Sequence, residues 1–355
     1  MAQPPPEDEW WEPGRFGDRL PRLRARAALT DTVRGFFQNH DFDEVETPAL
    51  QLSPGLEPHL TAFVTELDAA GGQGGTRYLH TSPEYAMKKL LVAGMARIFQ
   101  LARVWRNEQR SATHHPEFTM LEWYRAGAGW REVAADAEAL LRAVAQAVPD
   151  GDGLYRRAAA ESDPAQPWQF LSVADAFGNH AGIDLLATMP EPANPDRGLL
   201  AAEAARIGIR AESGDSWDDV FFRIFLDRVE PKLGIGVPTV LFDYPISMAA
   251  LARPSPDDPR VAERFEIFVC GMELANGFGE LTDAKEQRRR FEADIALKRS
   301  LGRDLYPIDE DFLAALAHGM PQSSGIALGF DRLVMLATGT TDIEDVLWVP
   351  MANNK

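Results

Sequence analysis

The segment EFTMLEWYR, residues 117–125, places a carboxylate, Glu122, inside an otherwise apolar run. Side chains alternate between the two faces of a strand, so Glu122 would share its face with every second neighbour. These neighbours are Phe118, Met120 and Tyr124. A ring, a thioether, a carboxylate and a phenol on one face suit a ligand that has a flat ring and an amine. A half-buried strand that tolerates a glutamate explains the pattern equally well.

Arg106 directly follows ARIFQLARVW, residues 96–105, which also has the composition of a strand. If the loop after it joins two antiparallel strands, Arg106 would lie near the face that carries Glu122. Arginine makes bidentate contacts with carboxylates and phosphates, which would give the site an anion-binding group. A surface ion pair is the alternative.

Two further glutamates, Glu266 and Glu273, lie in the apolar segment RFEIFVCGMELANGFGEL, residues 264–281. Their separation is odd, so a regular strand would put them on opposite faces, and a bulge at Gly271 would bring them onto one face. Buried carboxylates on one face require a cation, and oxygen ligands without Cys or His suit Mg²⁺. Solvated glutamates at a strand edge are the alternative.

A fourth segment, SSGIALGFDRL (residues 323–333), reads as a strand of small residues that runs into a helix. Small residues let another group approach the backbone closely. Arg332 would lie in the first helical turn, where an arginine and the helix N-terminus together form an anion site that suits a triphosphate. The sequence has no GxxxxGK[ST], no strand-framed GxGxxG and no kinase motifs, so nucleotide binding would need another framework.

The elements that must position these residues are strands joined by hairpins, long helices and an irregular stretch. We expect a helix from Pro21, a strand over residues 44–50, a hairpin over 59–81, and a helix capped by Ser82 with Pro83 in its first position. An Ala-rich helix would run from Trp130 to about residue 157. The short alternation of a doubly wound parallel sheet is missing, which favours an α+β fold with a mostly antiparallel sheet flanked by helices.

Composition sets the broad limits. The chain has 355 residues, 45% of them hydrophobic and 25% charged, and a net charge of −18. This balance is that of a soluble globular protein, and the acidic total makes nucleic acid an improbable main partner. A single cysteine, Cys270, excludes an internal disulfide framework and a Cys-cluster zinc site. With no signal peptide or membrane span expected, the cytoplasm is the predicted location.

Three of these segments, taken in order, resemble the class II aminoacyl-tRNA synthetases. Residues 34–50 (RGFFQNHDFDEVETPAL) resemble motif 1, residues 106–124 (RNEQRSATHHPEFTMLEWY) motif 2, and residues 325–333 (GIALGFDRL) motif 3. TSPEYAMKKLL and ELANGFGEL are similar to the lysyl-tRNA synthetases. The resemblance covers roughly residues 21–350 and implies that motif 1 forms a homodimer interface.

Three departures point to a particular branch of that family. Motif 1 begins about twenty residues from the N-terminus, Ser82-Pro83-Glu84 replaces Ala-Pro-Glu, and Ala327 replaces a motif 3 glycine. In its size and in these three departures, the chain resembles the truncated lysyl-tRNA synthetase paralogues that attach (R)-β-lysine to elongation factor P. We therefore expect a poorly ordered tail over residues 1–20 and one catalytic domain over 21–355. An insertion at about 130–230 is expected, and no anticodon-binding domain.

The resemblance implies nucleotide-binding roles for the motif residues. Arg106 would be the catalytic residue, bridging the substrate carboxylate and the α-phosphate of ATP. Glu108 and His114 would contact adenine and phosphates. Phe118 would stack on adenine, while Arg332 would cover the other face and meet the γ-phosphate. Glu266 and Glu273 would bind Mg²⁺. The family pattern HNPEF reads HHPEF here, which leaves the role of His115 open.

It also implies an amino-acid pocket. Glu280 and Tyr124 would hold the ε-amino group, Glu84 and Glu122 the other amino group, and Asn276 the carboxylate. Ser82 and Ala327 would reshape the pocket. Such a chain would activate (R)-β-lysine or lysine as an adenylate and transfer it to the ε-amino group of a lysine on elongation factor P. A ligase that acts on tRNA or a small amine, and an inactive regulatory paralogue, are the alternatives. The choice between the two lysines stays open.

Overall fold

A computed structural model describes residues 10–68, 71, 74–107, 110–192 and 194–351. Its centre is an eight-stranded sheet with the strand order β1-β5-β6-β13-β12-β11-β10-β9. The edge pairs β1–β5 and β9–β10 are parallel, and every other pair is antiparallel. This architecture confirms the α+β prediction. The strands of this sheet are β1 (Asp43–Glu44), β5 (Arg97–Trp105), β6 (Glu117–Ala126), β9 (Gln169–Ser172), β10 (Thr239–Pro245), β11 (Val261–Val269), β12 (Met272–Gly279) and β13 (Ser323–Gly329).

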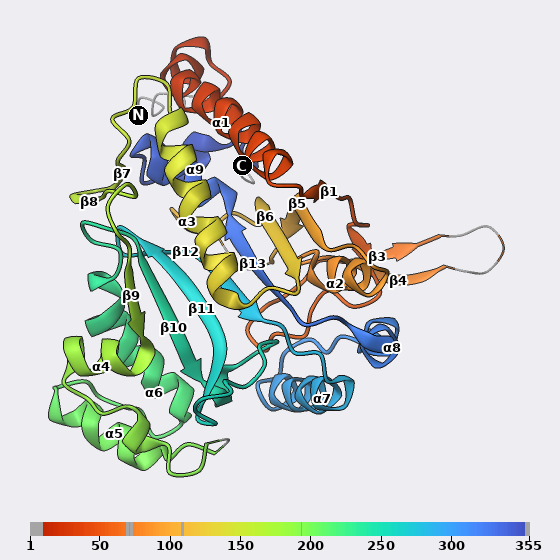
Figure 1. The fold of residues 1–355 in the computed structure, drawn as a ribbon, viewed down its shortest axis with the longest axis vertical. Helices are drawn as coiled ribbons and strands as arrows, with labels where there is room; N and C mark the ends of the chain where they lie inside the picture. Colours follow the sequence, from red (N-terminus) through yellow and green to blue (C-terminus); the bar gives the residue numbers. More distant parts are fainter. Residues whose placement is uncertain (1–9, 69–70, 72–73, 108–109, 193, 352–355) are drawn as a thin grey trace, which may run out of the picture.

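One face of this sheet is covered by three helices, α1 (Pro13–Asn39), α3 (Trp130–Ala147) and α9 (Phe330–Thr338) (Figure 1). Leu121 and Trp123 point from β6 into this core, and the Phe37 ring of α1 stacks on Phe99 of β5 at 4.6 Å between ring centroids. Because β6 alternates, burying Leu121 and Trp123 here turns Glu122 and Tyr124 to the opposite face. The helical layer thus determines which face carries the candidate site.

The opposite face is bordered at one end by α2 (Glu84–Val92), α7 (Ala284–Ser300) and α8 (Glu310–Gly319), which share a second apolar cluster. Beside them, β2 (Leu50–Gln51), β3 (Val64–Leu67) and β4 (Gly75–Leu79) form a small antiparallel sheet that projects from the body in Figure 1. The expected hairpin is therefore confirmed. Helix α2 starts one residue later than expected, at Glu84, and the Ser82 hydroxyl accepts a 3.0 Å bond from its N–H.

At the other end of the sheet, α4 (Val173–Ala181), α5 (Arg197–Arg206) and α6 (Trp217–Ile224) pack in a third cluster against β10 and β11. The predicted helix from Trp130 to about 157 is wrong at its end. Helix α3 stops at Ala147, and the chain turns into a hairpin of β7 (Tyr155–Arg157) and β8 (Ala160–Ser162), because Pro149 and two glycines interrupt it. Helix α3 lies in the main core.

Two expectations near the N-terminus need correction. Helix α1 begins at Pro13, not Pro21, so residues 13–20 of the expected disordered tail are helical. The buried Arg19 secures this first part, donating a 2.8 Å bond to the Glu344 carbonyl. The expected strand over 44–50 is two short strands, because the segment around Pro48 crosses from the large sheet to the small one.

The described residues also form five short helical turns: η1 (Leu186–Thr188), η2 (Phe225–Val229), η3 (Glu230–Lys232), η4 (Ile246–Met248) and η5 (Ile343–Val346). In the part of the chain that is described, no helix has the length and apolar character needed to cross a membrane.

Candidate active site

A row of cross-strand neighbours runs across the open face of the sheet. Glu122 on β6 pairs with Ala327 on β13, Ala327 with Asn276 on β12, and Asn276 with Glu266 on β11. These four residues lie up to 205 positions apart in the sequence, from Glu122 to Ala327, and the antiparallel register brings them into one line. Neighbouring strands are about 4.8 Å apart. The row therefore has the length of a small extended ligand.

Glu122 lies at one end of the row and is completely buried. Ser82 donates a 2.6 Å hydrogen bond to its Oε1, and the Tyr124 hydroxyl donates a 2.9 Å bond to its Oε2. Burial, and then the neighbouring Glu84, raises the pKa of Glu122 to about 8. A buried carboxylate with two neutral donors and a like charge nearby is a group that would gain from a cationic partner.

A lysine that sequence reasoning missed, Lys88, lies beside this carboxylate. Its Nζ is 2.5 Å from Oε1 of Glu84, one helical turn earlier, and 2.5 Å from Oε2 of Glu280. Burial raises the pKa of Glu280 to about 7, against the opposing effect of Lys88. A lysine in a helix normally extends into solvent, so its type and spacing carried no signal.

Glycine at position 325 keeps this end of the pocket compact. A Cβ there would lie 2.2 Å from the Tyr124 ring and 2.9 Å from Oε1 of Glu280. Tyr124 and Glu280 therefore border the same small space, as expected for two groups that hold one amine. In this structure the Tyr124 hydroxyl donates its hydrogen bond to Glu122.

Arg106 lies where β5 ends, and its guanidinium carbon is 5.3 Å from the centre of the Phe118 ring. Its backbone N–H donates a 2.9 Å bond to the Pro116 carbonyl, which closes the motif 2 loop. Burial lowers the pKa of Arg106, while Glu57 and Glu273 favour its charged form. The buried Nε has no hydrogen-bond partner in the described part of the chain. A desolvated guanidinium with a free donor is suited to an anionic ligand.

Arg332 comes from the first turn of α9, as expected, and is held from two sides. Its Nη1 donates a 2.8 Å bond to the Glu273 carbonyl, and its Nη2 a 2.7 Å bond to Nε2 of His114. Burial, then Arg332 and Arg106, lowers the pKa of His114 to about 4. The imidazole is therefore neutral and can accept from the guanidinium. Glu108, the other expected contact in this loop, lies outside the described residues.

Glu266 and Glu273 share the site face, but the bulge expected at Gly271 is elsewhere. The register shift falls in β12 at Leu274, between Glu273, which pairs with Phe268, and Ala275, which pairs with Ile267. Gly271 instead forms the hairpin turn, with φ of 66°. Because Glu266 and Glu273 are an odd number of residues apart, one extra residue between them is needed to bring both onto one face. The spacing alone does not show where that residue lies.

The two carboxylates have the character of a cation site. Burial, then Glu273, raises the pKa of Glu266 to about 7. Tyr244 donates a 2.6 Å bond to Glu266 and Arg264 a 2.7 Å bond, and neither was anticipated. Among the residues described, no group of three acidic, His or Cys side chains could hold a metal alone. Mg²⁺ in nucleotide enzymes usually takes one or two carboxylates together with phosphates, and this pair fits that arrangement.

His115, whose role was left open, has structural contacts. Its ring is buried, with Nδ1 2.6 Å from the Glu117 carbonyl, and its Nε2 accepts a 3.4 Å bond from the Met351 N–H. It thereby connects the start of β6 to the C-terminal segment.

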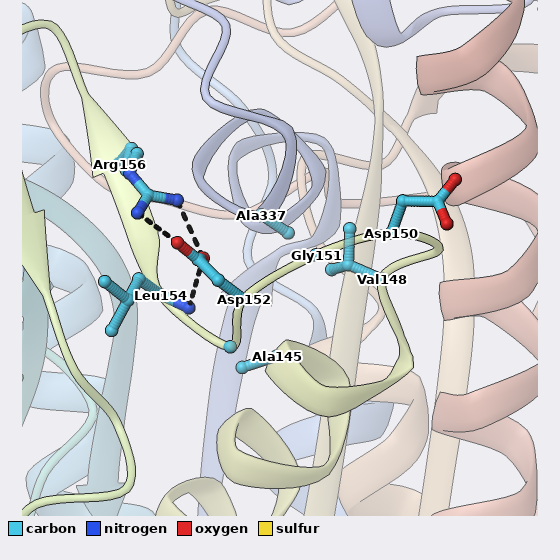
Figure 2. A pocket seen from close by; sticks show the side chains of 9 residues that line it. Ala145, Val148, Asp150, Gly151, Asp152, Leu154, Arg156 and Ala337 are labelled. Atoms are coloured by element: carbon cyan, nitrogen blue, oxygen red, sulfur yellow. Dashed lines mark hydrogen bonds and ion pairs between the residues drawn. The ribbon is translucent and has the colours of Figure 1, made fainter.

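A separate crevice lies between the end of α3 and α9, and contains none of the predicted site residues. Figure 2 shows Asp152 at its rim, where it accepts bonds from the Arg156 side chain and the Leu154 N–H. The charged side chains of Asp152 and Arg156 in this crevice pair with each other.

Comparison with known proteins agrees with this geometry. The family description "tRNA synthetases class II (D, K and N)" matches residues 18–353. The chain is 40% identical over 344 residues to proteins named elongation factor P–(R)-β-lysine ligase from Salmonella paratyphi A, Salmonella dublin and Salmonella heidelberg. In each case the match covers 96% of this chain and 97% of the relative.

Proposed function

Since this chain belongs to the class II tRNA synthetase family, we propose that it is an ATP-dependent ligase that activates (R)-β-lysine or lysine as an aminoacyl-adenylate. The acceptor of the activated group is the ε-amino group of a lysine on elongation factor P. The name of the full-length relatives supports this acceptor. Ser82 and Ala327, which depart from the synthetase pattern, lie on the pocket and support a substrate that differs from α-lysine.

One observation carries the proposal: three buried or half-buried carboxylates, Glu84, Glu122 and Glu280, enclose one end of the site. Acidic groups at that density match a substrate that carries two ammonium groups. Asn276, in the same row, would bind the substrate carboxylate, and Arg106 would bridge it to the α-phosphate. A site for a neutral amino acid would not need three carboxylates in a desolvated pocket.

The first chemical step needs no general base, because a carboxylate is already ionised near neutral pH. The substrate carboxylate attacks the α-phosphorus, the bond to the β-phosphate oxygen breaks, and pyrophosphate leaves. Arg106 orients the two reacting groups and stabilises negative charge that develops on the α-phosphate. Phe118 would stack on adenine, and Arg332 would exchange its His114 contact for the nucleotide.

Glu266 and Glu273 would hold Mg²⁺, which supplies charge neutralisation at the phosphates when bound. In the second step the acceptor amine attacks the adenylate carbonyl, the C–O bond to the phosphate breaks, and AMP leaves. We further propose a cytoplasmic homodimer joined through motif 1, on the resemblance to the class.

ATP–pyrophosphate exchange tests the proposal directly. (R)-β-Lysine or α-lysine should support exchange, while leucine and glutamate should not. Absence of exchange with either lysine would contradict the enzymatic function and favour the regulatory alternative. Arg106→Ala provides the negative control, because it removes the group that aligns the two reacting anions.

A further inference from the structure

Lys88 is an unusual component of an amine-binding pocket. It is 1% exposed, and its Nζ lies 2.5 Å from an oxygen of Glu84 and 2.5 Å from an oxygen of Glu280. A buried ammonium is costly unless it is paired. The two residues that pair with it are the ones assigned to the substrate. The pocket therefore contains its own cation before a ligand arrives.

The pairing leaves part of each carboxylate available. Lys88 contacts Oε1 of Glu84 and Oε2 of Glu280. Oε1 of Glu280 is buried and accepts no hydrogen bond from the residues that the structure describes. It lies beside Gly325 and the Tyr124 ring, where the lack of a side chain at position 325 lets these groups pack closely. Lys88 thus holds one oxygen of Glu280, and the other has no hydrogen-bond partner among the described residues.

The net charge of the pocket is a second reason to assign Lys88 a role in substrate binding. The fully ionised carboxylates of Glu84, Glu122 and Glu280 with Lys88 have a net charge of −2, which balances the two ammonium groups of a diamino acid. Other charged groups act on this set from the packed elements: Glu57 on Glu84, and Arg253 on Glu280. These two have opposite signs. Tyr85 and Tyr124, which also lie near Glu84, stay neutral because burial raises the pKa of both phenols.

We propose that Lys88 is a positioning residue: a resident counter-ion that pairs with Glu84 and Glu280 and orients both carboxylates to receive the amines of the substrate. It acts through these carboxylates and does not touch the reacting atoms. The inference rests on the proposed function, because it assigns Glu84 and Glu280 to the substrate.

The test compares Lys88→Met with Lys89→Met. Lys89 is the adjacent residue on α2, and its Nζ lies 2.9 Å from Asp311 and 3.3 Å from Asp309, away from the pocket. Without Lys88, Glu280 loses the cation that opposes the effect of burial, so its raised pKa rises further and the substrate must displace a proton. At pH 7 we expect the KM for the diamino acid to rise about tenfold or more, as one unit of pKa implies. At a pH of about 8.5 most of this increase should disappear, with kcat and the KM for ATP little changed throughout. Lys89→Met should match the wild type.

Two outcomes would overturn the proposal. One is an unchanged KM in Lys88→Met; the other is a fall in kcat alone that pH does not relieve, which indicates a purely structural role. If Lys88→Met does not fold, the Nζ resonance of Lys88 in the wild type provides the test. It should shift on addition of the diamino acid but not of ATP, and no shift would contradict the inference. If neither lysine supports ATP–pyrophosphate exchange by the wild type, the proposed function itself is refuted.

Discussion

The hydroxyl of Ser82 donates a 2.6 Å hydrogen bond to Oε1 of Glu122, and so joins the start of α2 to the middle of the central sheet. The hydroxyl oxygen of Ser82 also accepts a 3.0 Å hydrogen bond from the Glu84 N–H. One small side chain thereby positions two of the carboxylates assigned to the substrate. Where the lysyl-tRNA synthetase pattern has alanine, this link would be missing.

Ser82→Ala should weaken amino-acid binding. The hydroxyl stabilises the ionised form of Glu122, so its loss raises the pKa of that carboxyl further. A hydrogen bond to a charged group contributes about 1.5–3 kcal/mol, so the KM for the diamino acid should rise about tenfold in the exchange assay. Ser53→Ala is the matched control, because Ser53 is buried at the same crevice that Ser82 and Glu84 line, but its hydroxyl has no partner among the described residues. Equal effects of the two variants would refute the role of Ser82.

Substrate affinity should depend on pH through Glu122. Its pKa of about 8 means that it is mostly protonated at pH 7 in the free enzyme. An ammonium group binds the ionised form, so binding releases a proton and the KM for the diamino acid should fall as pH rises from about 6.5 to about 8.5, while the substrate amines remain charged. Calorimetry in buffers of different ionisation enthalpy measures the proton released. A flat KM profile without proton release would contradict the assignment.

Arg332→Ala should act on the nucleotide. The guanidinium is held by the Glu273 carbonyl and His114, so its removal leaves β12 and the motif 2 loop without their shared donor. Loss of one charge-assisted contact to phosphate, about 1.5–3 kcal/mol, should raise the KM for ATP about tenfold or more. The KM for the diamino acid should change little. Arg289→Ala, which removes a surface pair with Glu286 on α7, should leave both constants unchanged.

Glu266→Gln should raise the Mg²⁺ concentration needed for half-maximal exchange. The substitution removes the negative charge of Glu266, which lies near the negative charge of Glu273. It keeps the side-chain volume and the Tyr244 contact. We expect an increase of about tenfold, since one lost carboxylate ligand is a large part of a two-carboxylate site. Glu263→Gln on the same strand, which is paired with Arg253, is the control. An unchanged Mg²⁺ requirement in Glu266→Gln would place the metal elsewhere.

A buried ion pair between α1 and motif 3 should contribute to the stability of the fold. Arg26 of α1 contacts Asp331 of α9, and Asp331 also accepts a 2.6 Å bond from the Thr119 N–H of β6. Asp331→Ala leaves Arg26 buried and uncompensated, so the free energy of unfolding should fall by about 3 kcal/mol or more. Urea denaturation measures the change, and Arg26→Met/Asp331→Ala should recover part of it. A loss below about 1 kcal/mol would place the pair among weak surface contacts.

Much of the sheet could be predicted because its signals are local. The alternation in EFTMLEWYR placed Glu122 opposite Leu121 and Trp123, and the core under α1 and α3 follows from that period. The start of α1 was missed because Pro21 resembles a helix start, whereas here it lies inside a helix held by tertiary contacts at Arg19. Local propensity cannot show such contacts.

The site was predictable where residue type alone limits the chemistry, and not where partners decide it. Buried glutamates in apolar strands indicated Glu122 and Glu266 directly. Lys88 and Arg264 were missed, because a cation in a helix or a strand is ordinarily solvated and only the fold brings it to a carboxylate. The bulge position was likewise undetermined, since parity requires one extra residue but does not select Leu274 over Gly271.

The most direct test of the account follows labelled (R)-β-lysine, supplied with ATP and Mg²⁺, in parallel incubations with elongation factor P and with total tRNA. We predict ATP-dependent label on elongation factor P, lost when its acceptor lysine is replaced by arginine, and none on tRNA. Label on tRNA but not on the protein would contradict the proposed acceptor.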